Sequence, residues 1–141
     1  MNDTLQLQLE ERSKRIYTKL SSLLFWEWDE KLNIPLVEVA KKHADQVKEL
    51  LTEEFEFSWS VESLASAPKA IQEISQALSG MRGNQMLFTT NPESGAILFA
   101  SWWPWTNNEK VSVRIGLNYG GKMAMTEIEL TLSMRKWFNL E

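Results

Sequence analysis

The sequence predicts an α+β domain in which two to three N-terminal helices pack on one face of a four- to five-stranded antiparallel meander sheet. Apolar residues recur at helical spacing in the first half of the chain, whereas they alternate with polar residues from Met86 onward. Two short connections, Asn107-Asn108 and Gly120-Gly121, carry residue types that tolerate the positive φ of a type I′ hairpin turn. The 141 residues are expected to form a single domain, 1–141.

Helices are predicted at three places. The first covers residues 4–24, where leucines and one isoleucine recur at spacings of three, four and seven, and a loop is expected at 25–33. The second covers 34–54, because Pro35 suits the first turn of a helix and apolar residues follow at spacings of three and four. A short third helix is predicted at 68–78.

Strands are predicted where the alternation is strict. Residues 54–61 alternate glutamate or serine with large apolar residues, which favours an edge strand with its charges toward solvent. Four further strands are expected at 86–90, 96–105, 109–119 and 122–134. The order is then α-α-β-α-β-β-β-β.

The turns also predict the register of the meander. They place Trp102 opposite Val113, Tyr119 opposite Lys122, Val113 opposite Ile128, and Phe88 opposite Leu98. These pairings gather one continuous apolar set on one face of the sheet: Met86, Phe88, Ala96, Leu98, Ala100, Trp102, Val111, Val113, Ile115, Leu117, Tyr119, Ala124, Ile128, Leu130 and Leu132. A helix at 126–138, with Thr126 and Glu129 as a capping box, is the alternative to the last strand.

The order of these elements and the length of the chain resemble the cone-shaped folds of the nuclear transport factor 2 type. This resemblance rests on architecture and not on a motif. It implies a curved sheet wrapped around helices with a pocket between them, and it implies no particular chemistry.

Composition narrows the function classes. The net charge of −4 argues against a nucleic-acid binder, which needs a basic patch to neutralise phosphates. No run approaches the roughly 20 apolar residues that span a bilayer, and the polar N-terminus lacks the apolar core of a secretory signal. We therefore expect neither nucleic acid nor membrane as a partner, and a cytoplasmic location.

The sequence contains no catalytic constellation. The chain has no cysteine and a single histidine, His43, which makes a zinc site improbable and leaves a general base without an evident partner. The glycine-containing segment 80–85 lacks the lysine and hydroxyl of a phosphate-binding loop. We expect no catalytic residues, no metal and no cofactor, and the pattern favours binding over catalysis.

The second face of the predicted sheet is the strongest candidate for a binding surface. Such a face is usually polar when it is exposed to water, whereas this one is rich in Trp and Met beside an Arg. The candidate binding residues are Phe99, Trp103, Trp105, Arg114, Met123, Met125 and Glu127. Either the first helix or the C-terminal tail covers this face, or it binds a second copy of the chain or another protein.

A rival hypothesis is a small-molecule-binding or enzymatic cone. Its pocket would lie between helices and sheet, would be lined by His43, Phe57, Trp102 and Tyr119, and could hold a small apolar ligand.

Overall fold

The computed structural model describes residues 3–119, 122–123 and 128–141 and has an α+β fold. The elements are α1 (Asp3–Ser21), β1 (Glu27–Asp29), β2 (Ile34–Ala40), the 3-10 turn η1 (Lys41–His43), α2 (Ala44–Glu54), β3 (Phe57–Trp59), α3 (Val61–Leu64), α4 (Lys69–Ala77), β4 (Met86–Thr89), β5 (Ala96–Pro104), β6 (Lys110–Tyr119), β7 (Lys122–Met123) and α5 (Ile128–Trp137).

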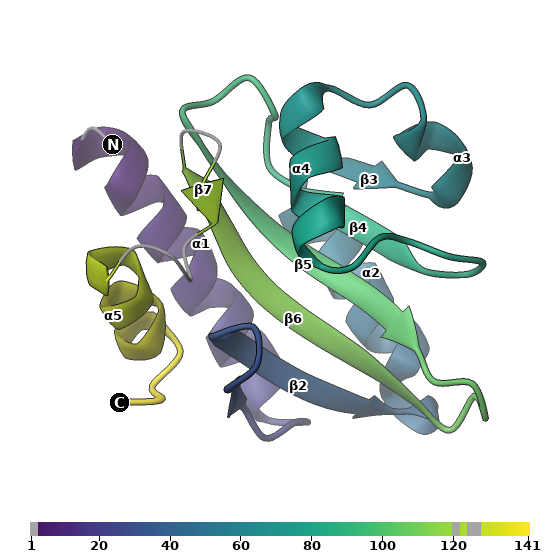
Figure 1. Cartoon of the computed structure of the whole chain (residues 1–141). Coiled ribbons are helices and arrows are strands. Elements are labelled where there is room, and N and C mark those ends of the chain that lie inside the picture. Colours follow the sequence, from purple (N-terminus) through teal and green to yellow (C-terminus); the bar gives the residue numbers. More distant parts are fainter. Residues whose placement is uncertain (1–2, 120–121, 124–127) are drawn as a thin grey trace.

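The strands form one antiparallel sheet in the order β1-β2-β6-β5-β4-β3 (Figure 1). The long strand β6 lies in the middle of the sheet. It pairs with β5 along its length, while its other side pairs with β2 near its start and with β7 near its end.

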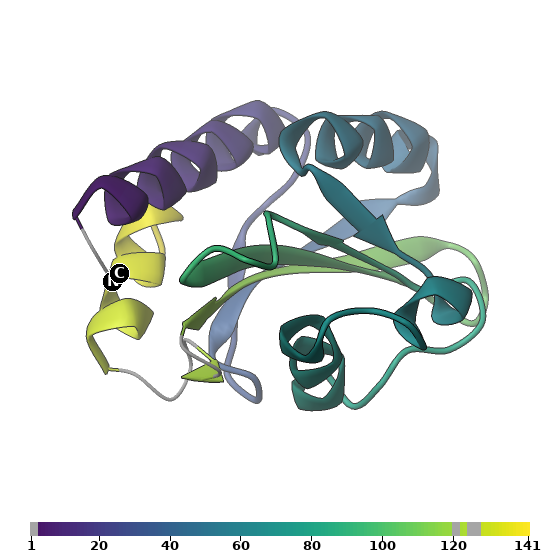
Figure 2. The same cartoon turned by 90° about the horizontal axis from the view of Figure 1, so that it is seen from above.

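Helices lie on both faces of the sheet. In Figure 2 α1 and α2 cover one face, α3 and α4 lie on the opposite face, and α5 lies beside α1. The expected arrangement with all helices on one face is therefore wrong. A sheet with helices on both faces also differs from the cone implied by the resemblance, in which a curved sheet is wrapped around helices.

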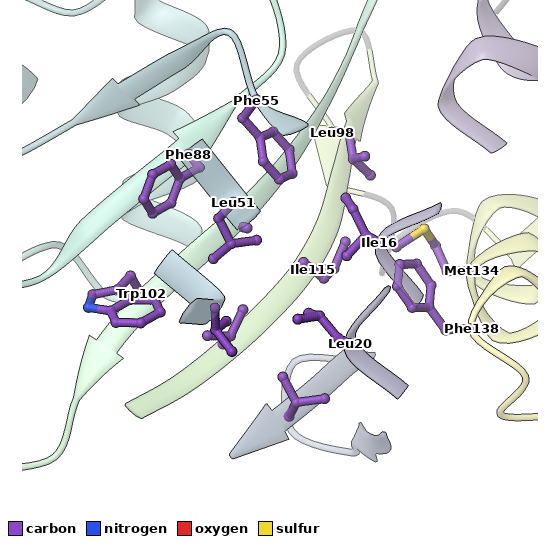
Figure 3. Close-up of a cluster of buried hydrophobic side chains, with 14 of the residues drawn as sticks. Ile16, Leu20, Leu51, Phe55, Phe88, Leu98, Trp102, Ile115, Met134 and Phe138 are labelled. Carbon is purple, nitrogen blue, oxygen red and sulfur yellow. The ribbon is translucent and has the colours of Figure 1, made fainter. Parts of the chain in front are cut away.

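The larger hydrophobic core lies between the sheet and α1, α2 and α5. Figure 3 shows its buried side chains converging from the three helices onto the strands: Ile16, Leu20, Leu51, Phe55, Phe88, Leu98, Trp102, Ile115, Met134 and Phe138. All the predicted core-face residues of β5 and β6 up to Leu117 belong to this cluster, and Met86 and Tyr119 pack against it. The prediction from turn chemistry and alternation is confirmed for these strands.

A smaller core lies between α4 and the second face. Ile71 and Ile74 of α4 pack with Leu87, Ile97 and Phe99 of the sheet. Phe99 lies over Gly116 of the neighbouring strand, where a side chain would collide with its ring.

The predicted register is confirmed between β5 and β6 and for the pairing of Tyr119 with Lys122. Trp102 is opposite Val113, and Tyr119 is opposite Lys122. The register between β4 and β5 is displaced by two residues, since Phe88 is opposite Ala100 rather than Leu98. A shift of two residues keeps every side chain on its predicted face, so the core set is unaffected.

The first half of the predicted second helix is a strand. Residues 34–40 form β2, and the helix starts only at Ala44. Val37 and Val39 are both fully buried, opposite Val113 and Val111. Their β-branched side chains favour an extended backbone, and their alternation fits the sheet.

Of the predicted last strand, 122–123 form β7, whereas 128–134 lie in the helix α5, which agrees with the alternative at 126–138 over the described residues. Thr126 of the predicted capping box lies outside the described residues. Ile128 cannot lie opposite Val113, because β2 occupies that side of β6. Met134 and Trp137 of the helix, and Phe138 directly after it, lie in the larger core, whereas Ile128 and Leu132 are 80% and 60% exposed.

Three smaller differences concern short elements. The predicted loop at 25–33 contains the strand β1, and the predicted strand at 54–61 is paired only at 57–59, as the edge strand β3. Helix α3 was not predicted; Ser60 and Ser63 cap its start by bonding to each other's backbone N–H groups.

Candidate ligand-binding face

The second face of the sheet is only partly covered. Helix α4 lies over β4 and the first half of β5, while in Figure 1 no helix lies in front of β2 and the adjacent half of β6. The uncovered part, which we call the open face, carries Trp103 opposite Ser112 and Arg114 opposite both Ser101 and Leu36. These positions share one face because side chains alternate along each strand.

The open face contains a hollow of about 490 Å³, which we call the Trp-Arg hollow. Its lining residues come from the end of β5, the following turn and the start of β6: Trp103, Pro104, Trp105, Thr106, Asn107, Ser112 and Arg114. Three of the seven predicted binding residues therefore lie together.

The turn between β5 and β6 fixes the position of Trp105. Its backbone N–H donates to Lys110 O at 2.8 Å, and Asn108 adopts a φ of 64°. Asn107 does not have a positive φ, so the predicted type I′ turn, which requires positive φ at both central residues, is not formed. The indole Nε1 donates to Ser112 Oγ at 2.9 Å, and the ammonium of Lys110 lies 5.3 Å from the ring centroid. The ring is thus held at the rim of the hollow by a hydrogen bond and a cation–π contact.

Arg114 is positioned from the other side by Asp29 of β1. The guanidinium Nε donates to Asp29 Oδ2 at 2.7 Å, while Asp29 Oδ1 also accepts from the backbone N–H groups of Lys31 and Leu32. Burial alone would raise the pKa of Asp29, but the hydrogen bond and charge of Arg114 and the two backbone donors outweigh it and lower the pKa. Asp29 is therefore ionised at neutral pH and orients Arg114 toward the hollow.

The other predicted binding residues are placed differently. Phe99 is fully buried beneath α4 and is part of the smaller core, so it is not available at the surface. The backbone of Met123 lies in β7, opposite Asn118. Met125 and Glu127 lie outside the described residues.

The rival pocket residues do not converge. His43 lines a hollow beside β2, and Phe57 lines another beside the N-terminal half of α1. Trp102 is buried in the larger core, and Tyr119 lies at the far end of β6. Packed side chains fill the space between α1, α2 and the sheet among the described residues (Figure 3).

Sequence reasoning missed the partner of Arg114. Asp29 lies in the segment 25–33, which was predicted to be a loop, and 85 residues separate it from Arg114. The sequence feature that could have indicated this pair is the short turn ending at Asn33. Asn33 has a φ of 62°, and the turn joins β1 to β2 as a hairpin.

No family model, curated protein or solved structure matches the chain. Within the described residues, no helix has the length and apolar character to cross a membrane, and no group of three or more His, Cys, Asp or Glu side chains could hold a metal ion.

Proposed function

We propose that the protein is a non-catalytic binding domain that docks a protein chain on the open face, with the Trp-Arg hollow at the centre of the contact. The observation that carries this proposal is the convergence of Trp103, Trp105 and Arg114 on one hollow. Trp and Arg are the residue types most enriched in binding hot spots, and central, well-positioned anchors contribute most of the affinity at interfaces.

The electrostatics of the hollow suit a polar anchor on the partner. The Nε of Arg114 is used by Asp29, and no other hydrogen bond to its guanidinium occurs among the described residues. The remaining N–H groups can receive a carboxylate or a backbone carbonyl, while the indole rings provide an apolar wall. The packed interior between helices and sheet gives no comparable support to the rival pocket.

A second copy of the chain and a different protein are the two partners to be distinguished. Light scattering over a dilution series distinguishes them, because a dimer has twice the mass of the 16.3 kDa chain. If the partner is a second copy, Trp105→Ala is expected to convert the dimer to a monomer. Leu7→Ser, which removes an exposed side chain from α1 behind the sheet, is the matched control and should leave the mass unchanged.

A monomer would direct the test to the hollow itself. Nuclear magnetic resonance with benzoate and indole as probes should then shift the indole N–H signals of Trp103 and Trp105, since hot-spot pockets adsorb small aromatic molecules. The same probes should not shift the Trp103 signal in the Trp105→Ala protein, nor either signal in the Arg114→Ala protein. A monomer in which neither probe shifts the two signals contradicts the proposal.

A further inference from the structure

The strand β2 is longer than the strand beside its outer edge. On that side β1 pairs only with Ile34, Pro35 and Leu36, whereas on the other side β6 pairs with Leu36 to Ala40. In the described part of the chain, no strand lies against the outer edge of residues 37–40. This edge, at the lower side of the sheet in Figure 1, is separate from the Trp-Arg hollow.

The register determines which backbone groups point outward there. Lys41 N–H donates to Glu109 O at 3.0 Å, so the residues of β2 that bond with β6 are those two and four positions earlier, Val39 and Val37. Alternate residues of an antiparallel strand direct their N–H and C=O groups to opposite sides. Glu38 therefore presents its N–H and C=O at the open edge, and Ala40 presents its N–H, while the Ala40 carbonyl caps the turn η1. These outward groups are a template for an added strand.

The space in front of this edge is a hollow of about 390 Å³. The chain that precedes β1 does not fill it, because the N–H groups of Leu23 and Leu24 both bond to Leu20 O and hold this segment at the end of α1. Leu23 and Phe25 form the opposite wall of the hollow, and the Phe25 side chain is 95% exposed. An extended backbone can thus pair with β2 on one side and contact an aromatic ring on the other.

The charges along the edge are polarised. Lys42 and His43 line the hollow at the Ala40 end, and Lys41 is adjacent; neither lysine has an ion pair among the described residues. The carboxylate of Glu38 is compensated by Lys110 at 4.0 Å, and Glu27 lies at the opposite end, beside Leu36. This pattern complements a segment with a carboxylate near Lys41 and Lys42.

We propose that the outer edge of β2 at Glu38 and Ala40 binds an extended acidic segment of another protein, which adds to the sheet as a further strand. Its backbone pairs with the outward groups of these two residues, an acidic side chain lies near Lys41 and Lys42, and an apolar side chain contacts Phe25.

The φ of Ala40 allows a sharp test. Ala40 has φ −65° and ψ 149°, values that proline adopts without strain, and its N–H points away from β6. Ala40→Pro therefore removes one edge donor and places a ring in the path of an added strand, while the pairing of β2 with β6 is kept. Ala40→Ser retains the N–H and is the matched control. Thermal unfolding of both variants checks that the fold is intact.

The probe is an array of octapeptides in which Val, Ile or Phe alternates with Asp, Glu, Thr or Ser. The labelled protein and the Ala40→Ser variant are expected to bind the same acidic subset, and Ala40→Pro to bind that subset about tenfold more weakly or not at all, since it loses an edge hydrogen bond and gains a steric block. N-methylation of alternate peptide residues should abolish binding, and Lys41→Glu with Lys42→Glu should weaken it.

Three results would overturn the proposal. Binding of the acidic subset by Ala40→Pro as tightly as by the control excludes the edge, and so does the absence of any bound peptide. A dimer that is present in the natural chain and the Ala40→Ser variant but lost in Ala40→Pro would identify a second copy, rather than an acidic segment of another protein, as the occupant. Because Ala40 does not line the Trp-Arg hollow, the first two results do not bear on the proposed function of the open face. The third would show that a dimer seen by light scattering forms through the edge and not through the open face.

Discussion

The size of a single side chain can determine how closely a neighbouring residue packs on the central strands. Gly116 is the clearest case, because the ring of Phe99 from the neighbouring strand lies over it. A Cβ at this position would lie 2.7 Å from Phe99 Cε2 and closer still to Cζ. The absence of a side chain at Gly116 is therefore a packing requirement of the smaller core, and it has no connection with a turn.

Gly116→Ala is expected to destabilise the protein by about 1–3 kcal/mol, because the fully buried Phe99 ring must leave its rotamer or push against α4. Urea unfolding followed by circular dichroism measures the change. The double variant Gly116→Ala with Phe99→Leu should recover part of the loss, since leucine lacks the colliding ring atoms. A Gly116→Ala protein as stable as the natural one would show that the ring does not occupy this position.

Alternation along the strands could predict the side of the sheet on which a residue lies, and this was sufficient to place Trp103, Trp105 and Arg114 together. It could not predict what covers each side. Phe99 has the same parity as Trp103 but lies under α4, and the position of α4 depends on packing between distant segments. The ion pair between Asp29 and Arg114 also could not be predicted from alternation, because it forms only when β1 and β2 join the sheet.

At the scale of elements, α1 and α2 are joined by one buried carboxylate. The Glu54 side chain, only 7% exposed, accepts hydrogen bonds from Arg15 Nε at 3.1 Å and from Lys19 Nζ at 3.0 Å, while its backbone carbonyl accepts from Arg12. Burial alone would raise the pKa of Glu54, but the hydrogen bonds and charges of Arg15 and Lys19 outweigh it and lower the pKa.

The stability of the fold should therefore fall in acid. A carboxyl group whose pKa is lower in the folded than in the unfolded chain stabilises the fold above the unfolded pKa, roughly 4.3 for Glu, and this contribution is lost as the pH falls through the folded pKa. Urea unfolding between neutral pH and pH ~3 measures the loss. Glu54→Gln is expected to be less stable at neutral pH and to show a smaller decrease toward acid. Parallel pH profiles for the two proteins would exclude this role of Glu54.

The helix α5 and the expected strand at 122–134 make opposite predictions for Leu132, which the strand would place on the core face together with Met134. In the helix Leu132 is exposed, whereas Met134 is fully buried. Leu132→Lys should change the free energy of unfolding by no more than about 0.5 kcal/mol, while Met134→Lys should cost more than about 3 kcal/mol, because it buries a charge in the larger core. Thermal and urea unfolding provide the comparison. Severe destabilisation by Leu132→Lys would instead support the strand.

The same two elements show why part of the fold could not be predicted from local pattern. Residues 34–40 were predicted to be helical but form a strand, whereas the alternating residues 128–134 were predicted to be a strand but lie in a helix. The edge of β6 that faces away from β5 decides which of the two segments becomes a strand. Only one strand can pair there with Val111 and Val113, and β2 occupies this position. Periodicity measures local amphipathicity, and it does not decide between two segments that compete for one sheet edge.

For the whole molecule, the important feature is a sheet between two cores of unequal size. The cluster on the side of α1, α2 and α5 contains 21 buried side chains among the described residues, and the one under α4 contains eight. Both clusters depend on β5, but only the smaller one depends on α4. The α4 layer should therefore separate from the sheet at a lower free energy than the strands separate from one another.

Native-state hydrogen exchange should resolve this difference. The amides of Ile71 to Ala77 are expected to exchange through an opening that costs less than global unfolding, whereas those of Val113 and Ile115 should exchange only on global unfolding. Equal exchange free energies for the two groups would show that the molecule opens as one unit.

Opening of the α4 layer would expose Leu87, Ile97 and Phe99 on a sheet that is otherwise intact. Aggregation on warming is then expected to start from a molecule that retains most of its native structure, at temperatures below the midpoint of unfolding. A covalent crosslink between α4 and the sheet is expected to suppress such aggregation even if the melting temperature is unchanged.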